Sequence, residues 1–270
     1  GIAALVPVTL GFATLVRSRD RRSASDGALA GLLLAFSAML RFQTGLLYVA
    51  ALALFVFMAL RDRQRGPLVG FLCGGLAGAA LQGLWDLRTY GHWFGSLRAY
   101  LAYNIENSSN FGTSPWFTYF VFFLLFTLPP ITVWLSRPLW NAIRIAPWVS
   151  TPLVFFVVVH SLIPHKEERF MFAVLGLFFV LLASALRSVP RTLQGAFWTI
   201  NGLDLVLATF SDGNRAVATP MREVSELSTI RDVVTVGRFY APPLYAGFGV
   251  RLHRVRLEGF ENWLPQARNL

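Results

Sequence analysis

The sequence predicts an all-α polytopic membrane protein with a small solvated domain at its C-terminal end. Of 270 residues, 55% are hydrophobic and 14% are charged, whereas about a quarter of the residues of a soluble domain are charged. The mean hydropathy is +0.53. Apolar runs approach the roughly 20 residues that cross a bilayer and end at Arg, Pro or Gly.

The basic residues are distributed as in the loops of a membrane protein. The net charge is +10, and Lys166 is the only Lys beside 23 Arg. A nucleic-acid-binding protein clusters its bases on one solvated face, but here they form short groups between apolar runs. The single cysteine, Cys73, excludes an intramolecular disulfide framework and a Cys-based zinc site. We expect a lipid bilayer as partner, and no nucleic acid, metal or cofactor.

Residues 1–210 are expected to hold about six to eight membrane helices. The expected apolar segments are 2–16, 28–60, 67–84, 116–135, 148–163, 170–186 and 194–210. The second is interrupted at Arg41–Gly45, and its first part, 28–40, would span only about 20 Å as a helix. We therefore expect this part to be tilted, broken or re-entrant. The polar and aromatic stretch 85–115 is predicted to be an external loop.

The bases also predict an orientation, because loops rich in Arg and Lys stay cytoplasmic. Placing 17–22, 61–65, 136–147 and 187–191 in the cytoplasm puts 11 of the 16 bases that precede residue 211 on that side. The Arg41 segment, the loop 85–115 and the segment 165–169 then share the opposite, lumenal or periplasmic side. The polar interruptions are thus predicted to meet on one face.

The last 60 residues differ in composition from the rest of the chain. Residues 211–270 carry eight Arg and six acids, with short runs of high β-propensity such as 233–236. They predict an external, soluble tail domain of α/β or irregular structure. At the other end the chain opens at Gly1, without Met and already inside an apolar run, so we interpret it as a piece of a longer protein.

The segment Pro164–Phe170 holds the densest cluster of ionisable groups. His165, Lys166, Glu167, Glu168 and Arg169 follow one another between two apolar runs. A solvated, charge-balanced turn is one interpretation. The alternative is a functional site, because ionisable groups beside a membrane are costly, Lys and Arg can bind phosphate, and a Glu can take a proton.

The sequence His165-Lys166-Glu167-Glu168-Arg169-Phe170 resembles the HKEERF signature of glycosyltransferase family 22. Its members are the dolichyl-phosphate-mannose-dependent mannosyltransferases of the N-glycan and glycosylphosphatidylinositol-anchor pathways. Three further stretches resemble family motifs over about residues 1–190. They are Arg41-Phe42-Gln43-Thr44, the residues Asp86, Tyr90-Gly91 and Trp93, and Asn104 with Phe111-Gly112-Thr113-Ser114-Pro115-Trp116.

The resemblance implies the GT-C architecture and an inverting transfer of mannose from a polyprenyl-phosphate donor to a glycan or glycolipid acceptor. The main general base of such enzymes lies in the first external loop, which we expect upstream of Gly1. The implied donor-phosphate ligands are His165, Lys166, Arg169 and Arg41. Candidates for catalysis are Asp86, Glu167 and Glu168, and candidates for substrate binding are Gln43, Trp93, Asn104, Trp116 and Tyr119.

Several of these residues have a structural alternative. Asp86 could be an interfacial acid, Arg41 could extend to the interface, and the aromatic residues could be membrane anchors. The rival functions are a transporter or lipid flippase, for which paired broken helices would be expected, and a non-catalytic membrane subunit. In each case the protein is expected in a membrane, that of the endoplasmic reticulum in a eukaryote or the cytoplasmic membrane in a bacterium.

Overall fold

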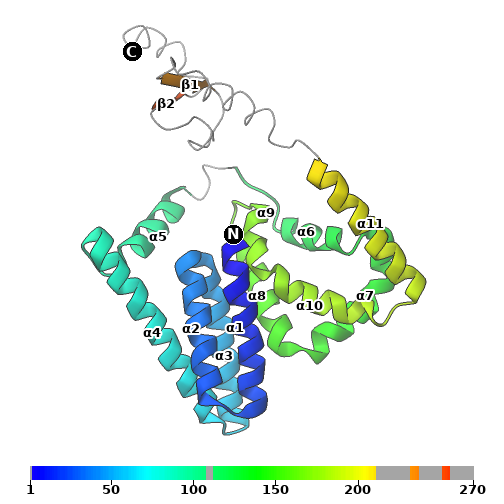
Figure 1. The fold of residues 1–270 in the computed structure, drawn as a ribbon, viewed down its shortest axis with the longest axis horizontal. Helices are drawn as coiled ribbons and strands as arrows, with labels where there is room; N and C mark the ends of the chain where they lie inside the picture. The colour runs from blue at the N-terminus through cyan, green and yellow to red at the C-terminus, as the bar shows by residue number, and fades with distance from the viewer. Residues whose placement is uncertain (1, 108–111, 211–231, 237–250, 256–270) are drawn as a thin grey trace. The chain divides into compact units, whose positions relative to one another are not determined.

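The structure is a computed structural model that describes residues 2–107, 112–210, 232–236 and 251–255 (Figure 1). The chain divides into two compact units, Gly1–Thr199 and Ile200–Leu270. The regular elements of the first unit are all helices in its described residues, which agrees with the predicted fold class. The second contains the end of the last helix and two short strands.

Several helices could cross a membrane. Judged by length and composition, the described residues contain three candidate spans: Phe42–Arg61, Arg65–Tyr90 and Glu168–Leu186. A bent pair of helices, Thr118–Phe126 and Ile131–Ile145, would make a fourth. These helices support an integral membrane protein. The expected number of six to eight spans stays a prediction.

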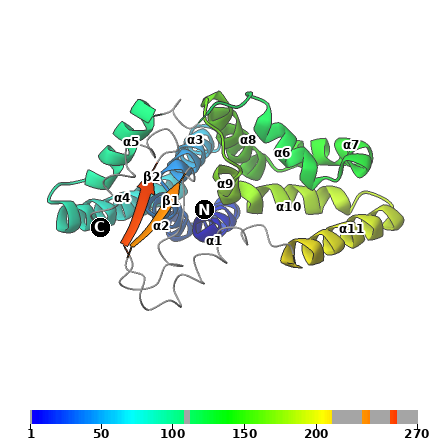
Figure 2. The same cartoon turned by 90° about the horizontal axis from the view of Figure 1, so that it is seen from above.

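The first helices of the chain pack side by side (Figures 1 and 2). They are α1 (Ile2–Arg21), α2 (Ala24–Leu40), the 3-10 turn η1 (Phe42–Thr44) and α3 (Gly45–Arg61). The expected break in the second apolar run is therefore present, between α2 and α3. The 17 residues of α2 are apolar but shorter than a candidate span.

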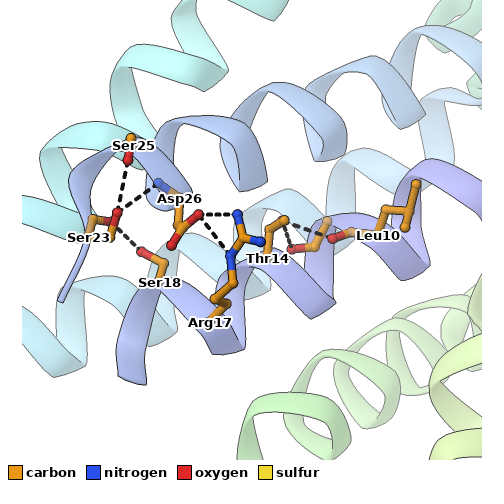
Figure 3. Close-up of polar contacts among 8 residues, drawn as sticks. Leu10, Thr14, Arg17, Ser18, Ser23, Ser25 and Asp26 are labelled. Carbon is orange, nitrogen blue, oxygen red and sulfur yellow. Dashed lines mark hydrogen bonds and ion pairs between the residues drawn. The ribbon is translucent and has the colours of Figure 1, made fainter. Parts of the chain in front are cut away.

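A polar network fixes the turn between α1 and α2 (Figure 3). The side chain of Ser23 caps α2 by accepting from the N–H of Asp26 at 3.2 Å, as N-cap residues do. The carboxylate of Asp26 pairs with the guanidinium of Arg17, and Ser18 Oγ donates to the carbonyl oxygen of Ser23 at 2.7 Å. Charged residues expected in a solvated loop thus hold two helices together.

Helix α4 (Arg65–Tyr90) packs closely on α2 through glycines. Gly27 and Gly31 lie on α2, and Gly70 and Gly74 lie on α4. A Cβ atom added at any of the four would collide with a main-chain carbonyl oxygen of the other helix. Small residues allow this close approach between membrane helices.

The region predicted as the loop 85–115 contains more helix than expected. Helix α4 continues to Tyr90 and ends at Gly91, whose φ of +77° suits the residue after a helix C-terminus. A further helix, α5, covers Gly95–Asn107. Residues 85–107 are therefore the end of one helix, a turn and a second helix rather than an irregular loop.

The apolar run 116–135 does not form one straight helix. It is divided into α6 (Thr118–Phe126) and α7 (Pro129–Ile145), bent by 104° at the break. Helix α7 begins with two prolines. Proline has no main-chain N–H, but this costs no hydrogen bond at the start of a helix, because the first N–H groups have no partner within the helix. Leu128, just before them, has a φ of +57°, a strained value for a residue with a side chain.

The remaining helices complete the first unit. They are α8 (Pro147–Leu162), α9 (Glu168–Met171), the 3-10 turn η2 (Phe172–Val174), α10 (Leu175–Leu186) and α11 (Arg191–Phe210), which extends into the second unit. Helix α10 packs against α7 and α8, and α8 packs against α3. Phe55, Leu135, Phe156 and Leu181, at most 1% exposed, belong to the shared apolar core.

The described part of the second unit includes a parallel pair of strands, β1 (Asp232–Val236) and β2 (Arg251–Val255). Asp232 pairs with Arg251 and Val236 with Val255. Strand β1 therefore includes residues 233–236, the run whose composition favours a strand. Most of the predicted tail domain lies outside the described residues, and its boundaries stay a prediction.

Candidate active site

Two motif segments far apart in the chain are joined by hydrogen bonds. The segment 112–119 leads into the first turn of α6, and the segment 163–170 follows α8 and continues into α9. Lys166 Nζ donates to the carbonyl oxygen of Ser114 at 3.0 Å and to that of Ile163 at 2.7 Å. The ammonium group thus bridges the two segments. Two of its three donors are directed at main-chain oxygens.

Further contacts extend this connection. The N–H of Ser114 donates to the carbonyl oxygen of Pro164 at 3.0 Å, and His165 Nδ1 lies 3.2 Å from the carbonyl oxygen of Gly112. Because each of these contacts involves a main-chain oxygen, they fix the path of both segments. The two sequence motifs are therefore parts of one structural unit.

Tyr119, in the first turn of α6, contacts the main chain of the charged segment through its hydroxyl group. Its side chain is buried, at 1% exposed. The hydroxyl accepts from the N–H of Glu167 at 3.1 Å and donates to the carbonyl oxygen of the same residue at 3.3 Å. A residue expected to bind substrate is thus placed as a support for the residue that carries the carboxylate.

The two carboxylates of the segment have different surroundings. Glu167 accepts from His165 Nε2 at 3.0 Å and from Arg169 Nη2 at 2.9 Å, with a second bond from Arg169 Nε. Burial alone would raise the pKa of Glu167, but the hydrogen bonds from Arg169 and His165 outweigh it and hold that pKa below the usual value. Glu168 is exposed and forms no hydrogen bond or ion pair within the described residues.

Phe170 joins the charged segment to the Arg41 turn. The guanidinium of Arg41 lies over its ring, 5.2 Å from the centroid, a cation–π arrangement. The rings of His165 and His160 lie 6.1 Å and 6.2 Å from it. The motif residues Arg41 and Phe170, 129 positions apart in the sequence, are therefore in contact.

Arg41 is half-buried between α2 and η1. Its Nε donates to the side-chain oxygen of Gln43, and η1 is held by a bond from Thr44 Oγ1 to the carbonyl oxygen of Arg41 at 2.9 Å. Burial lowers the pKa of Arg41, and the positive charge of Arg169 lowers it further. Two guanidinium groups that repel each other favour an anion between them.

Asp86 lies in a polar cluster of its own near the end of α4. Its carboxylate is 1% exposed and accepts from the N–H and Oγ of Ser96 at 3.0 and 2.6 Å and from Gln82 Nε2 at 2.8 Å. The N–H of Ser96 belongs to the first turn of α5, where helical N–H groups have no intrahelical partner. Asp86 therefore anchors the start of α5.

Helix α5 places Tyr100 beside the Arg41 turn, a residue that the sequence analysis did not select. Its ring lies 5.1 Å from that of Phe42, and its side chain interacts with Gln43. Burial raises the pKa of Tyr100, while Arg41 and Gln43 act in the opposite direction. No motif in the sequence around Tyr100 indicated a role for it, because its contact with Phe42 depends on the α4–α5 turn.

Three other candidates have contacts with residues close to them in the sequence. The ring of Trp93 packs over Gly83 of α4. Asn104 Nδ2 donates to the carbonyl oxygen of Tyr100 at 2.7 Å, a bond along α5. Trp116 is 66% exposed and contacts the aromatic rings that follow it in the chain.

The site is built, then, from the segments 41–43, 112–119 and 165–170 with Tyr100, and each of the three segments carries a family motif. The model of the Alg9-like mannosyltransferase family matches residues 3–229. No curated protein and no solved structure matches the chain. The matched region covers most of the chain and includes every site residue named above. The chain belongs to the Alg9-like mannosyltransferase family, and this membership supports the function of a membrane mannosyltransferase.

Proposed function

We propose that this protein transfers mannose from a polyprenyl-phosphate donor to a glycan or glycolipid acceptor with inversion at C1, on the lumenal or periplasmic face. The acceptor oxygen bonds to C1 of mannose, the bond between C1 and the phosphate oxygen breaks, and polyprenyl phosphate leaves. The hydroxyl proton passes to a carboxylate. This chain's part is to bind the phosphate and to orient the acceptor.

The observation that carries the proposal is that two cationic groups lie together at the motif segments: Arg169 pairs with Glu167, and Arg41, which lies over Phe170, is close enough to interact with the charges of both. The leaving phosphate needs cationic groups where its charge develops, and preorganised donors supply this stabilisation. The side chain of Arg169 is 67% exposed although it is paired with Glu167. Its guanidinium can therefore meet an incoming phosphate without leaving its partner.

The two carboxylates of the segment are assigned different roles. Glu167 orients Arg169 and His165, because it is bonded to both. Glu168 is the exposed carboxylate of the segment and has no bond within the described residues, so it is the one that can bind or deprotonate an acceptor hydroxyl. Glu168→Gln is therefore expected to lower kcat and to leave donor binding intact.

The test uses the full-length protein reconstituted in liposomes with a radiolabelled polyprenyl-phosphate-mannose donor. Arg169→Gln and Arg41→Gln should each lower kcat by about 100-fold or more, the usual effect of removing one donor that stabilises transition-state charge. Arg98→Gln, an exposed position on α5, is the matched control and should retain wild-type transfer. Near-normal activity in both site variants would overturn the phosphate-binding role.

A further inference from the structure

The imidazole ring of His165 lies between two hydrogen-bond acceptors. Its Nδ1 is 3.2 Å from the carbonyl oxygen of Gly112, and its Nε2 is 3.0 Å from Oε1 of Glu167. Burial would raise the pKa of Glu167, but the hydrogen bonds from Arg169 and His165 outweigh it, so this carboxylate is ionised at neutral pH. Neither a carbonyl oxygen nor an ionised carboxylate can donate a hydrogen bond. Each contact therefore requires an N–H group on the ring.

These two contacts select one protonation state of His165. Neutral imidazole has one N–H and one bare nitrogen, whereas imidazolium has two N–H groups. In the neutral ring the bare nitrogen would direct its lone pair at an oxygen of either Gly112 or Glu167, and the two lone pairs would repel each other. The charged ring makes both bonds. Because the His165 side chain is only 19% exposed, solvent screens such a repulsion only in part.

The four charged residues that follow His165 have different surroundings. Glu167 contacts the ring and also binds Arg169. The ammonium group of Lys166 is directed at main-chain oxygens, and Glu168 is exposed. With His165 charged, the segment carries three positive and two negative groups. This excess of positive charge suits a segment that binds phosphate.

Other elements of the described structure bring few ionisable groups to His165. The motif segment that leads into α6 has no acidic or basic residue, and the hydroxyl of its Tyr119 is bonded to the main chain of the charged segment. The ring of Phe170 meets that of His165 edge-on, and Arg41 and His160 contact the same Phe170 ring. The acid that contacts the His165 ring thus comes from its own segment.

One carboxylate oxygen connects His165 to Arg169. Oε1 of Glu167 accepts from His165 Nε2 at 3.0 Å and from Arg169 Nη2 at 2.9 Å, and the second oxygen accepts from Arg169 Nε. A guanidinium that forms two parallel bonds to a carboxylate takes its direction from that carboxylate. The direction of Arg169 therefore depends on the bond that holds Glu167 to His165, and the ring is itself held at Gly112.

We propose that His165 is a positioning residue for mannose transfer, whose doubly protonated ring holds Glu167 and thereby orients the Arg169 guanidinium toward the donor phosphate. This inference rests on the proposed function, since it concerns the phosphate of the same donor. The motif led us to expect His165 as a phosphate ligand. In the role inferred here both ring N–H groups bind the protein, and the effect of His165 passes through Arg169. When the pH rises and the ring loses a proton, one of the two contacts is lost and transfer falls.

Two substitutions distinguish the charged ring from the neutral one. His165→Arg keeps a permanent charge and several N–H donors, whereas His165→Gln offers one donor group and one acceptor, as the neutral ring does. Transfer would be measured with the full-length enzyme in liposomes and a radiolabelled polyprenyl-phosphate-mannose donor from about pH 5.5 to about pH 9, a range that includes the ordinary titration of histidine. Relative to His165→Arg, the wild-type kcat should fall by about 10-fold across this range, the effect of losing one hydrogen bond to a charged group. It should approach the level of His165→Gln at the alkaline end.

The matched control is His92→Gln, because His92 is exposed on the turn between α4 and α5. This variant should keep the wild-type pH profile. A double variant tests the route through Arg169. Because Arg169→Gln already removes the group that His165 positions, adding His165→Gln to it should lower kcat by no more than about 2-fold. A His165 that contacts the phosphate directly would lower kcat in that background by the full 10-fold or so.

A measurement on the wild type does not depend on how the variants fold. Exchange of the C2 hydrogen of the imidazole for deuterium, followed by mass spectrometry of the peptide that contains His165, reports the titration of this ring. Its midpoint should coincide with that of the alkaline fall in kcat. A ring that is neutral where transfer is fastest, or full additivity in the double variant, would overturn the positioning role. An enzyme that transfers no mannose from this donor at any pH would instead overturn the proposed function, and the exchange measurement would still give the protonation state of His165.

Discussion

The carboxylate of Asp86 accepts hydrogen bonds from both the main-chain N–H and the hydroxyl of Ser96, at 3.0 and 2.6 Å. This pair joins α4 to the first turn of α5 across the turn at Gly91. Helix α5 also places Tyr100 beside the Arg41 turn. Asp86, which was expected to act on the substrate, can therefore affect the site indirectly by holding α5 in place.

We predict that Ser96→Ala and Asp86→Ala both lower mannose transfer, because each weakens the anchor of α5. Loss of a helix-capping bond costs about 0.5–2 kcal/mol, so α5 should also become more accessible to protease. Activity and limited proteolysis at residues 91–107 would be measured together. If Asp86 acts on the acceptor directly, Ser96→Ala will keep near-normal activity while Asp86→Ala loses it.

A second prediction concerns Lys166, which bridges Ser114 and Ile163. Lys166→Met keeps much of the side-chain volume and removes the donors, and hydrogen bonds to a charged group contribute about 1.5–3 kcal/mol each. We expect faster amide hydrogen exchange at 112–119 together with loss of transfer. A variant that loses transfer with unchanged exchange would show that Lys166 acts on the donor alone and does not fix the loop.

The class of fold could be predicted from the sequence, and three of the predicted motif segments contact one another. Apolar runs predicted a helical membrane protein, and the break at Arg41–Gly45 is present between α2 and α3. Distribution of the bases placed the three motif segments on one face, and contacts such as that of Arg41 with Phe170 are consistent with it. These features follow from local composition, which a single sequence displays.

Other features depend on tertiary contacts and could not be predicted. Lys166 was expected to bind the donor phosphate, and its Nζ donates to main-chain oxygens 52 and 3 positions away in the sequence. Tyr100 gave no signal because its neighbour Phe42 is brought to it by the α4–α5 turn. The apolar run 116–135 was expected as a single segment, and the bend of 104° between α6 and α7 depends on packing that the run does not show.

The close contact of α2 with α4 gives a prediction about stability. Gly70→Ala and Gly74→Ala place a Cβ against a main-chain carbonyl oxygen of α2, and overpacking of this kind costs about 1–3 kcal/mol. Gly66→Ala on the same helix is the matched control, because the nearest atom to its Cβ is 3.9 Å away. Thermal unfolding in detergent should show lower Tm values for the first two variants and an unchanged or higher Tm for the control.

The last prediction uses the depressed pKa of Glu167. A carboxylate whose pKa is lower in the folded than in the unfolded protein adds stability at pH values above its unfolded pKa, and this contribution disappears as the pH falls through the folded value. With an ordinary value of 4.5, the wild type should lose stability progressively as the pH is lowered below about 4.5. Glu167→Gln should have a lower Tm at neutral pH and a weaker dependence on pH in the acidic range.

Glu168→Gln provides the control for this titration, since the exposed Glu168 carboxylate has no partner within the described residues. Its Tm should stay close to that of the wild type at each pH, because this substitution removes no hydrogen bond or ion pair among the described residues. If Glu167→Gln and Glu168→Gln give the same pH profile, the bonds from His165 and Arg169 to Glu167 do not stabilise the folded protein. The charged segment would then be held by its other contacts, such as those of Lys166 with Ser114 and of the Glu167 main chain with the Tyr119 hydroxyl.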